Sequence, residues 1–152
     1  MRGNFSIVAV LAVAMTGWGQ GSAQTRIGTF DSRCVAVAYY NSPDFQKEKP
    51  EYQGPAVQSL MHYQVFSNAS IPNIVDKLGS VLPTVAADAR VSMIVSKWDV
   101  AFKDASVEYV DVTDALVQAL KPDAKVVQWA ASLKPQPPMP LLHAVKTLRP
   151  DR

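Results

Sequence analysis

The sequence predicts an α+β fold: a small, mainly three- to four-stranded sheet with flanking helices and a short helical insertion between the first strand and a hairpin. Residues 91–120, VSMIVSKWDVAFKDASVEYVDVTDALVQAL, predict the hairpin, because β-branched runs flank a turn and a helix start follows them. Residues 41–90 predict the insertion, because their apolar side chains recur at helical spacing. We expect a single domain over residues 24–134.

Residues 1–23 have the layout of a secretory signal peptide. Arg2 supplies a positive charge, residues 5–15 are an apolar run, and residues 21–23 are the small residues that precede a cleavage site. The apolar run is shorter than the ~20 residues that a stable transmembrane helix needs. We therefore expect a mature chain that begins at Gln24, is periplasmic or secreted, and has no stable membrane anchor after cleavage.

The charge and cysteine content narrow the classes of function. The chain has 15 basic and 13 acidic residues, a formal net charge of +2, and the two signs are interspersed. It therefore has no electrostatic reason to bind nucleic acid. Its single cysteine, Cys34, forms no internal disulfide, and the apolar run CVAVAYY around it predicts a small buried side chain.

The first elements of the predicted domain are a strand and two helix starts. Residues 26–30, RIGTF, predict a short strand, and Asp31 or Ser32 then caps a helix by accepting hydrogen bonds from its first amides. A second helix starts after Ser42, with Pro43 at its first position.

The rest of the insertion is predicted as two helical segments. Residues 55–68 show an amphipathic helical pattern. Residues 71–89 repeat the pattern, but Gly79 and Pro83 interrupt it. Because proline removes a backbone hydrogen bond and clashes with the preceding turn, this segment is either two short helices or one kinked helix.

The hairpin is predicted around a tryptophan. Residues 91–97 alternate in a strand-like way, Trp98 and Asp99 form the turn, and residues 100–102 return as the second strand. Residues 107–112 add a third extended piece.

A capped helix and a tail complete the chain. Asp111 or Thr113 caps a helix over residues 114–120, and a further helix ends near Leu133. Residues 135–152 form a proline-rich C-terminal tail, whose composition favours an extended arm that docks on the body or on a neighbouring subunit.

No pattern for catalysis, metal binding or phosphate binding is present. The two histidines, His62 and His143, have no partner ligand at metal-binding spacing. The sequence has no glycine-rich phosphate loop and no nucleophile elbow, and Asp111 and Asp114 are better explained by the helix start. We therefore expect no enzyme, no catalytic residues, no cofactor and no metal.

Two stretches, RIGTFDSRCVAVAY and residues 91–121, resemble the sheet-forming ends of the Skp/OmpH periplasmic chaperone family. That family has a first strand ending in Asp, a helix, a long coiled-coil arm, and a hairpin that leads to an Asp-Ile-Thr helix start. The corresponding residues here are Phe30, Asp31, Val95, Val100, Phe102, Asp111, Val112 and Thr113. The chain is also similar to uncharacterised exported bacterial proteins that carry the same FDSR and VSKWD stretches.

The resemblance implies an OmpH-like body that binds unfolded or outer-membrane client proteins, and it allows a homotrimer. The segment over residues 41–90 is much shorter than the family's arm and is broken by prolines, so the client cage of the family is not expected. The candidate client- or partner-binding residues are the apolar stripe Leu60, Met61, Ile74, Leu78 and Val85. The same stripe is also what an intramolecular core requires.

The alternative hypothesis is a small periplasmic ligand-binding domain or enzyme. Its candidate ligand site is the hairpin tip at Lys97, Trp98 and Asp99, where an aromatic ring adjoins two opposite charges. A packed tryptophan beside a surface ion pair worth under about 1 kcal/mol explains the same three residues without a ligand.

Overall fold

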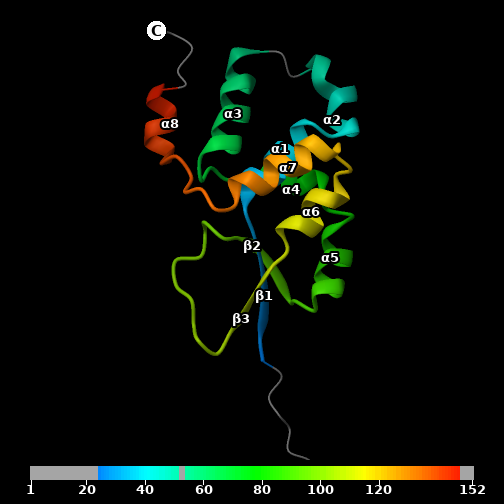
Figure 1. Ribbon diagram of the computed structural model, residues 1–152, viewed down its shortest axis with the longest axis vertical. Coiled ribbons are helices and arrows are strands. Elements are labelled where there is room, and N and C mark those ends of the chain that lie inside the picture. The colour runs from blue at the N-terminus through cyan, green and yellow to red at the C-terminus, as the bar shows by residue number, and fades with distance from the viewer. Residues whose placement is uncertain (1–23, 52–53, 148–152) are drawn as a thin grey trace, which may run out of the picture.

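The computed structural model of this chain describes residues 24–51 and 54–147, which form an α/β fold built on a three-stranded parallel sheet. The first strand, β1 (Arg26–Phe30), is central, and β2 (Met93–Ser96) and β3 (Glu108–Asp111) pair with it on either side. Figure 1 shows this sheet below a layer of helices.

The predicted small sheet with flanking helices is confirmed, but the hairpin within it is wrong, and the parallel strand order makes the fold α/β and not α+β. Strands β2 and β3 both run parallel to β1, so that Ile27 is aligned with Met93 on one side and with Tyr109 on the other. Tight hairpins need turn residues such as Asn-Gly or Asp-Gly, which Trp98 and Asp99 do not supply. Their turn, closed by Asp99 N donating to Ser96 O at 3.1 Å, ends β2, and the expected return strand over residues 100–102 is irregular.

Within the described ranges, the sheet is accompanied by eight α-helices and one short 3₁₀ helix. The elements are α1 (Ser32–Tyr40), α2 (Pro43–Glu48), the 3₁₀ helix Lys49–Glu51, α3 (Pro55–Phe66), α4 (Pro72–Lys77), α5 (Leu82–Ala89), α6 (Thr113–Ala119), α7 (Ala124–Leu133) and α8 (Leu141–Thr147). Residues 41–90, expected as a helical insertion, thus hold α2 to α5. The interrupted segment forms two short helices, with Gly79 between them.

Helix α1 is the centre of the core. Every residue from Asp31 to Tyr40 is buried, and the helix contacts α3, α6 and α7. Cys34 is fully buried, as its apolar surroundings predicted, and its Sγ donates to Ala130 O at 3.1 Å. Burial raises the pKa of this thiol to about 12, so it stays protonated and unreactive.

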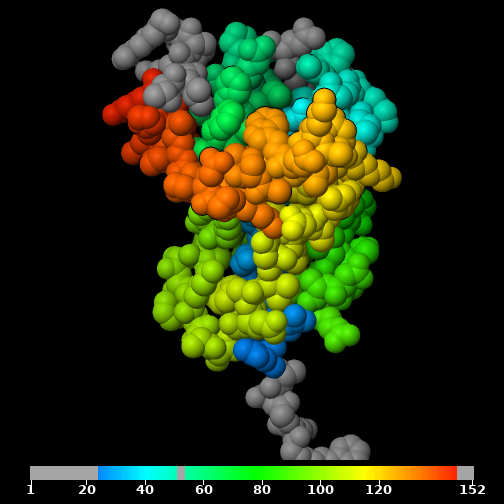
Figure 2. Space-filling model, in the orientation of Figure 1, coloured from blue at the N-terminus to red at the C-terminus, as the bar shows by residue number. Residues whose placement is uncertain are grey.

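The chain after α7 folds back on its own domain. Met139 N donates to Phe66 O at 2.9 Å, a parallel bridge joins Ser67 and Met139, and Ala144 of α8 is buried. Figure 2 shows this segment running across the face of the molecule next to α3. The part of the proline-rich tail that the structure describes therefore packs against α3.

The predicted signal peptide, residues 1–23, lies outside the described residues. Within the described part of the chain, no helix combines the length and the apolar character needed to cross a membrane.

Replacing Gly28 with valine tests the close approach of β1 to β2. A Cβ at Gly28 would lie 3.1 Å from Ile94 Cγ1 and 3.3 Å from Met93 O, so these neighbours on β2 must shift by a few tenths of an ångström. We expect Gly28→Val to lower the free energy of unfolding by about 1–3 kcal/mol, a typical cost of overpacking. Urea denaturation followed by circular dichroism measures the change.

Gly54→Ala is the control, because a Cβ at Gly54 meets no atom within 4 Å. It should cost clearly less than the change at Gly28. A Gly28→Val variant as stable as the parent would contradict the pairing of β1 with β2.

Candidate functional site

The three strands end at one edge of the sheet, and each brings a charged residue there. Asp31 follows β1, Lys97 follows β2, and Asp111 ends β3. Hydrogen bonds to carbonyl groups of β1 fix the residues that follow the two outer strands. Phe30 O accepts from Lys97 N at 2.8 Å, and Thr29 O accepts from Val112 N at 2.9 Å. In open parallel sheets, ligands bind outside the carboxyl ends of the strands.

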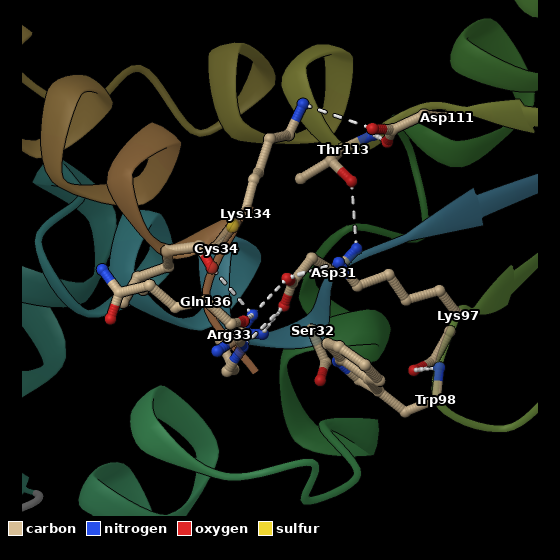
Figure 3. Close-up of polar contacts among 12 residues, drawn as sticks. Asp31, Ser32, Arg33, Cys34, Lys97, Trp98, Asp111, Thr113, Lys134 and Gln136 are labelled. Carbon is tan, nitrogen blue, oxygen red and sulfur yellow. Dashed lines mark hydrogen bonds and ion pairs between the residues drawn. The ribbon is translucent and has the colours of Figure 1, made fainter. Parts of the chain in front are cut away.

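The Asp31 carboxylate is the centre of a buried ion cluster, which consists of Asp31, Arg33 and Lys97 (Figure 3). Asp31 is 0% exposed, and its Oδ1 caps α1 by accepting from Arg33 N at 3.0 Å. Arg33 also donates through Nε to Oδ1 at 3.1 Å and through Nη2 to Oδ2 at 2.8 Å. Lys97 Nζ lies 2.8 Å from Oδ2. Both carboxylate oxygens are thus bound by cations.

Arg33 connects this cluster to the C-terminal half of the chain. It is 2% exposed, and its Nη2 also donates to Leu133 O and to Gln136 O, each at 2.9 Å. Trp98 lies beside the two cations, with Arg33 Cζ 5.2 Å and Lys97 Nζ 4.4 Å from its ring. Both distances are within cation–π range. The cluster therefore holds together β1, α1, the turn after β2 and the segment after α7.

A second polar group lies next to the cluster at the end of β3. Asp31 N donates to Thr113 Oγ1 at 3.0 Å, and Thr113 N donates to Asp111 Oδ1 at 2.8 Å. Lys134 Nζ lies 3.3 Å from Asp111 Oδ2 and 2.9 Å from Asp114 Oδ2. Neither predicted cap is the N-cap of α6, which is Val112. Asp111 lies one position before it and accepts from Thr113 N, while the Thr113 side chain accepts from the residue that follows β1.

These contacts keep the acidic groups ionised. Burial by itself raises the pKa of Asp31, but the hydrogen bonds and charges of Arg33 and Lys97 outweigh it and hold that pKa below its ordinary value. Burial is also the largest single influence on the pKa of Asp111 and raises it, but the hydrogen bonds of Thr113 and the charge of Lys134 together outweigh it and lower that pKa. A fully paired, ionised Asp31 is a poor general base, since no lone pair is left to accept a proton from a substrate.

An apolar pocket of about 360 Å³ adjoins the cluster at the same edge. Phe30 and Ser96, the last residues of β1 and β2, line it directly beside Asp31 and Lys97. Ile94 and Val95 of β2 also line it, and the remaining wall comes from α4, α5, α6 and the chain around α4, through Ile71, Pro72, Val75, Leu78, Leu82 and Leu116. Ser70, Asp76 and Asp99 complete the lining.

The structure separates the three residues of the predicted ligand site. They lie in the turn after β2 rather than at a hairpin tip. Lys97 and Trp98 belong with the ion cluster, whereas Asp99 lines the pocket. The ion pair of Lys97 involves a fully buried carboxylate, so it is not a pair on the surface.

The predicted client-binding stripe is divided between the core and the surface. Ile74, Leu78 and Val85 are buried in the core, so they offer no surface to a client in this conformation. Leu60 is 43% exposed on α3, and Met61 beside it is partly buried against the core.

Sequence reasoning missed the Asp31–Arg33 pair and the pocket. Asp31 was recognised as a helix cap and as the end of the first strand, but not as one of a pair, although the FDSR stretch places an acid and a base directly after a strand. That signal points to a buried pair only if the strand is known to be central in a parallel sheet. Among the described residues, no group of three or more His, Cys, Asp or Glu side chains is arranged to hold a metal ion.

Comparison with models of known protein families, with curated proteins and with solved structures gives no significant match.

Replacing Asp31 with asparagine tests the buried cluster. The amide can still cap α1, but it leaves the Arg33 guanidinium buried without a counter-charge, so we expect a loss of about 3–5 kcal/mol in unfolding free energy at pH 7. Because the folded pKa of Asp31 is lowered, its contribution is complete above about pH 4 and is lost as pH falls further. The variant should therefore show a weaker loss of stability between about pH 4 and pH 2.

Urea denaturation at pH 7, 4 and 3 measures both effects. Asp44→Asn is the control, because Asp44 and its partner Lys47 are exposed and their pair is solvated. If Asp31→Asn were no less stable than Asp44→Asn at pH 7, the cluster would not have the structural role described above.

Proposed function

We propose that this chain is a small exported domain that binds an apolar small molecule in the pocket beside the carboxyl ends of β1 and β2. The observation that supports this proposal is the pocket of about 360 Å³, largely apolar, at the edge where parallel sheets bind ligands. Binding is favoured over catalysis because the lining has no Cys, His or Lys, and the charged pair beside it, Asp31 and Arg33, is buried and bound to each other.

The ion cluster suits the pocket to binding because it holds two of its walls in place. Phe30 precedes the buried Asp31, and Ser96 precedes Lys97, so the two strand ends are connected through the Lys97–Asp31 contact. A wall that is ordered before the ligand arrives reduces the entropy lost on binding.

The pocket volume limits the size of the ligand. At roughly 30 Å³ per non-hydrogen atom, the share of one water in the liquid, about 360 Å³ holds roughly twelve such atoms. Each buried methylene contributes about 0.8 kcal/mol, or about fourfold in affinity. Affinity for linear alcohols should therefore rise with chain length and level off near decan-1-ol.

Titration with decan-1-ol tests this function. We expect saturable changes in the backbone amide NMR signals of Val75, Leu82 and Ile94, which line the pocket. Val75→Trp should weaken binding by at least about tenfold, because the indole fills space that the alkyl chain needs. Leu60→Trp, on the exposed face of α3 and outside this pocket, is the matched control.

Two results would contradict the proposal. One is the absence of saturable binding up to the solubility limit of the alcohol. The other is equal binding by Val75→Trp and Leu60→Trp, which would place the alcohol elsewhere.

A second candidate function is the binding of unfolded client proteins, as the Skp/OmpH resemblance implies. The observation that favours it is a group of exposed apolar side chains on α3 and α7. Leu60, Phe66 and Trp129 are 43%, 40% and 40% exposed, and Phe66 and Trp129 line one pocket of about 300 Å³. Exposed apolar surface of this kind marks protein interaction sites.

Light scattering during dilution of an unfolded outer-membrane protein tests this second candidate. The chain should suppress aggregation at equimolar ratio, and a Phe66→Ser/Trp129→Ser variant should suppress it clearly less, because it loses the two aromatic contacts. Val75→Trp should behave as the parent does. An absence of suppression by the parent chain would remove this candidate.

A further inference from the structure

We infer that the ligand of the pocket beside β1 and β2 is an amphipathic amine, with an alkyl or aromatic body and a positively charged amino group at the rim. This inference rests on the proposed ligand-binding function and adds the chemical class of the ligand. It follows from the charges around the pocket.

The polar part of the pocket lining is acidic. Four polar residues line it, Ser70, Asp76, Ser96 and Asp99, and the two charged ones are both aspartates. Lys, Arg and His are absent from the lining. A ligand with a carboxylate or phosphate would therefore find no counter-charge there and would be repelled, while an ammonium group would find two acceptors of opposite charge.

The cations closest in sequence to these aspartates are bound elsewhere. Lys77 follows Asp76, but its Nζ lies 2.9 Å from Glu48 Oε1. Lys97 is two positions before Asp99, and its Nζ lies 2.8 Å from Asp31 Oδ2. Within the described part of the chain, neither Asp76 nor Asp99 has a side-chain hydrogen bond or ion pair. The other aspartates at this edge, Asp31, Asp111 and Asp114, are all paired with a lysine or arginine.

The two serines provide the remaining acceptors for an amino group. An alkylammonium has three donors, which both carboxylate and hydroxyl oxygens can accept. Ser96 is buried beside the ion cluster, and its Oγ accepts from Trp98 N at 3.2 Å, which orients the hydroxyl at the end of β2. Its second lone pair is available to the ligand, as is the exposed hydroxyl of Ser70.

Calorimetric titration with three ligands of one chain length, decan-1-ol, decylamine and decanoate, tests the inference at pH 7. Decylamine, protonated at this pH, should bind about fivefold more tightly than decan-1-ol, the upper gain from a solvent-exposed ion pair, because Asp76 and Asp99 are exposed. Decanoate should bind most weakly. The preference for the amine should fall as salt rises, because the rim carboxylates are solvent-accessible.

Matched variants test whether Asp76 and Asp99 cause the preference for the amine. Asp76→Asn/Asp99→Asn should bring the affinity for decylamine down to that for decan-1-ol and leave the alcohol affinity unchanged. Asp88→Asn removes the same kind of charge from α5 outside the pocket lining, so it should retain the preference for the amine.

The outcomes separate this inference from the function on which it rests. If neither decan-1-ol nor decylamine binds, the proposed function fails. If decan-1-ol binds but decylamine binds no more tightly, the ligand class is wrong. If the preference for the amine survives in Asp76→Asn/Asp99→Asn, the amino group is not held at this rim and the inference is overturned.

Discussion

The Asp31 carboxylate lies where β1, α1, the turn after β2 and the segment after α7 meet, and the arrangement of these elements depends on its contacts. Burying a charge costs several kcal/mol unless it is paired and hydrogen-bonded, so Asp31 and Arg33 can be buried only together. Once paired, they bring Leu133 O, Gln136 O and Lys97 to the same point. The cluster thus connects the two halves of the chain at the carboxyl edge of the sheet.

The same ion pairs determine the electrostatic character of the neighbouring pocket. Lys97 is held on Asp31 and Lys77 on Glu48, so neither lysine neutralises the rim aspartates Asp76 and Asp99. Because both lysines are bound away from the pocket, its rim stays acidic beside an apolar wall. In this way a buried contact that serves stability also sets which class of ligand the pocket favours.

Local features of the fold were predictable, whereas strand pairing was not. The strand over residues 26–30 and the caps at Asp31 and Ser42 agree with the structure, since each depends on the few residues beside it. The hairpin was wrong because alternation identifies a strand without identifying its partner. For the candidate site, Asp99 was identified from the sequence, but Asp76 and the apolar wall come from segments that only folding brings together.

Taken by itself, the sequence determined the first strand, the main helix starts and the burial of Cys34, because hydrogen bonds and apolar spacing within a few residues decide them. Only the tertiary structure decided that β1 is central in a parallel sheet, that Asp31 and Arg33 are buried together, and that a pocket adjoins them. The physical reason is distance along the chain. Arg33 donates to the carbonyl of Leu133, which lies 100 positions away in the sequence. Such a hydrogen bond is strengthened by burial, and burial depends on the whole fold, so no local sequence pattern can predict it.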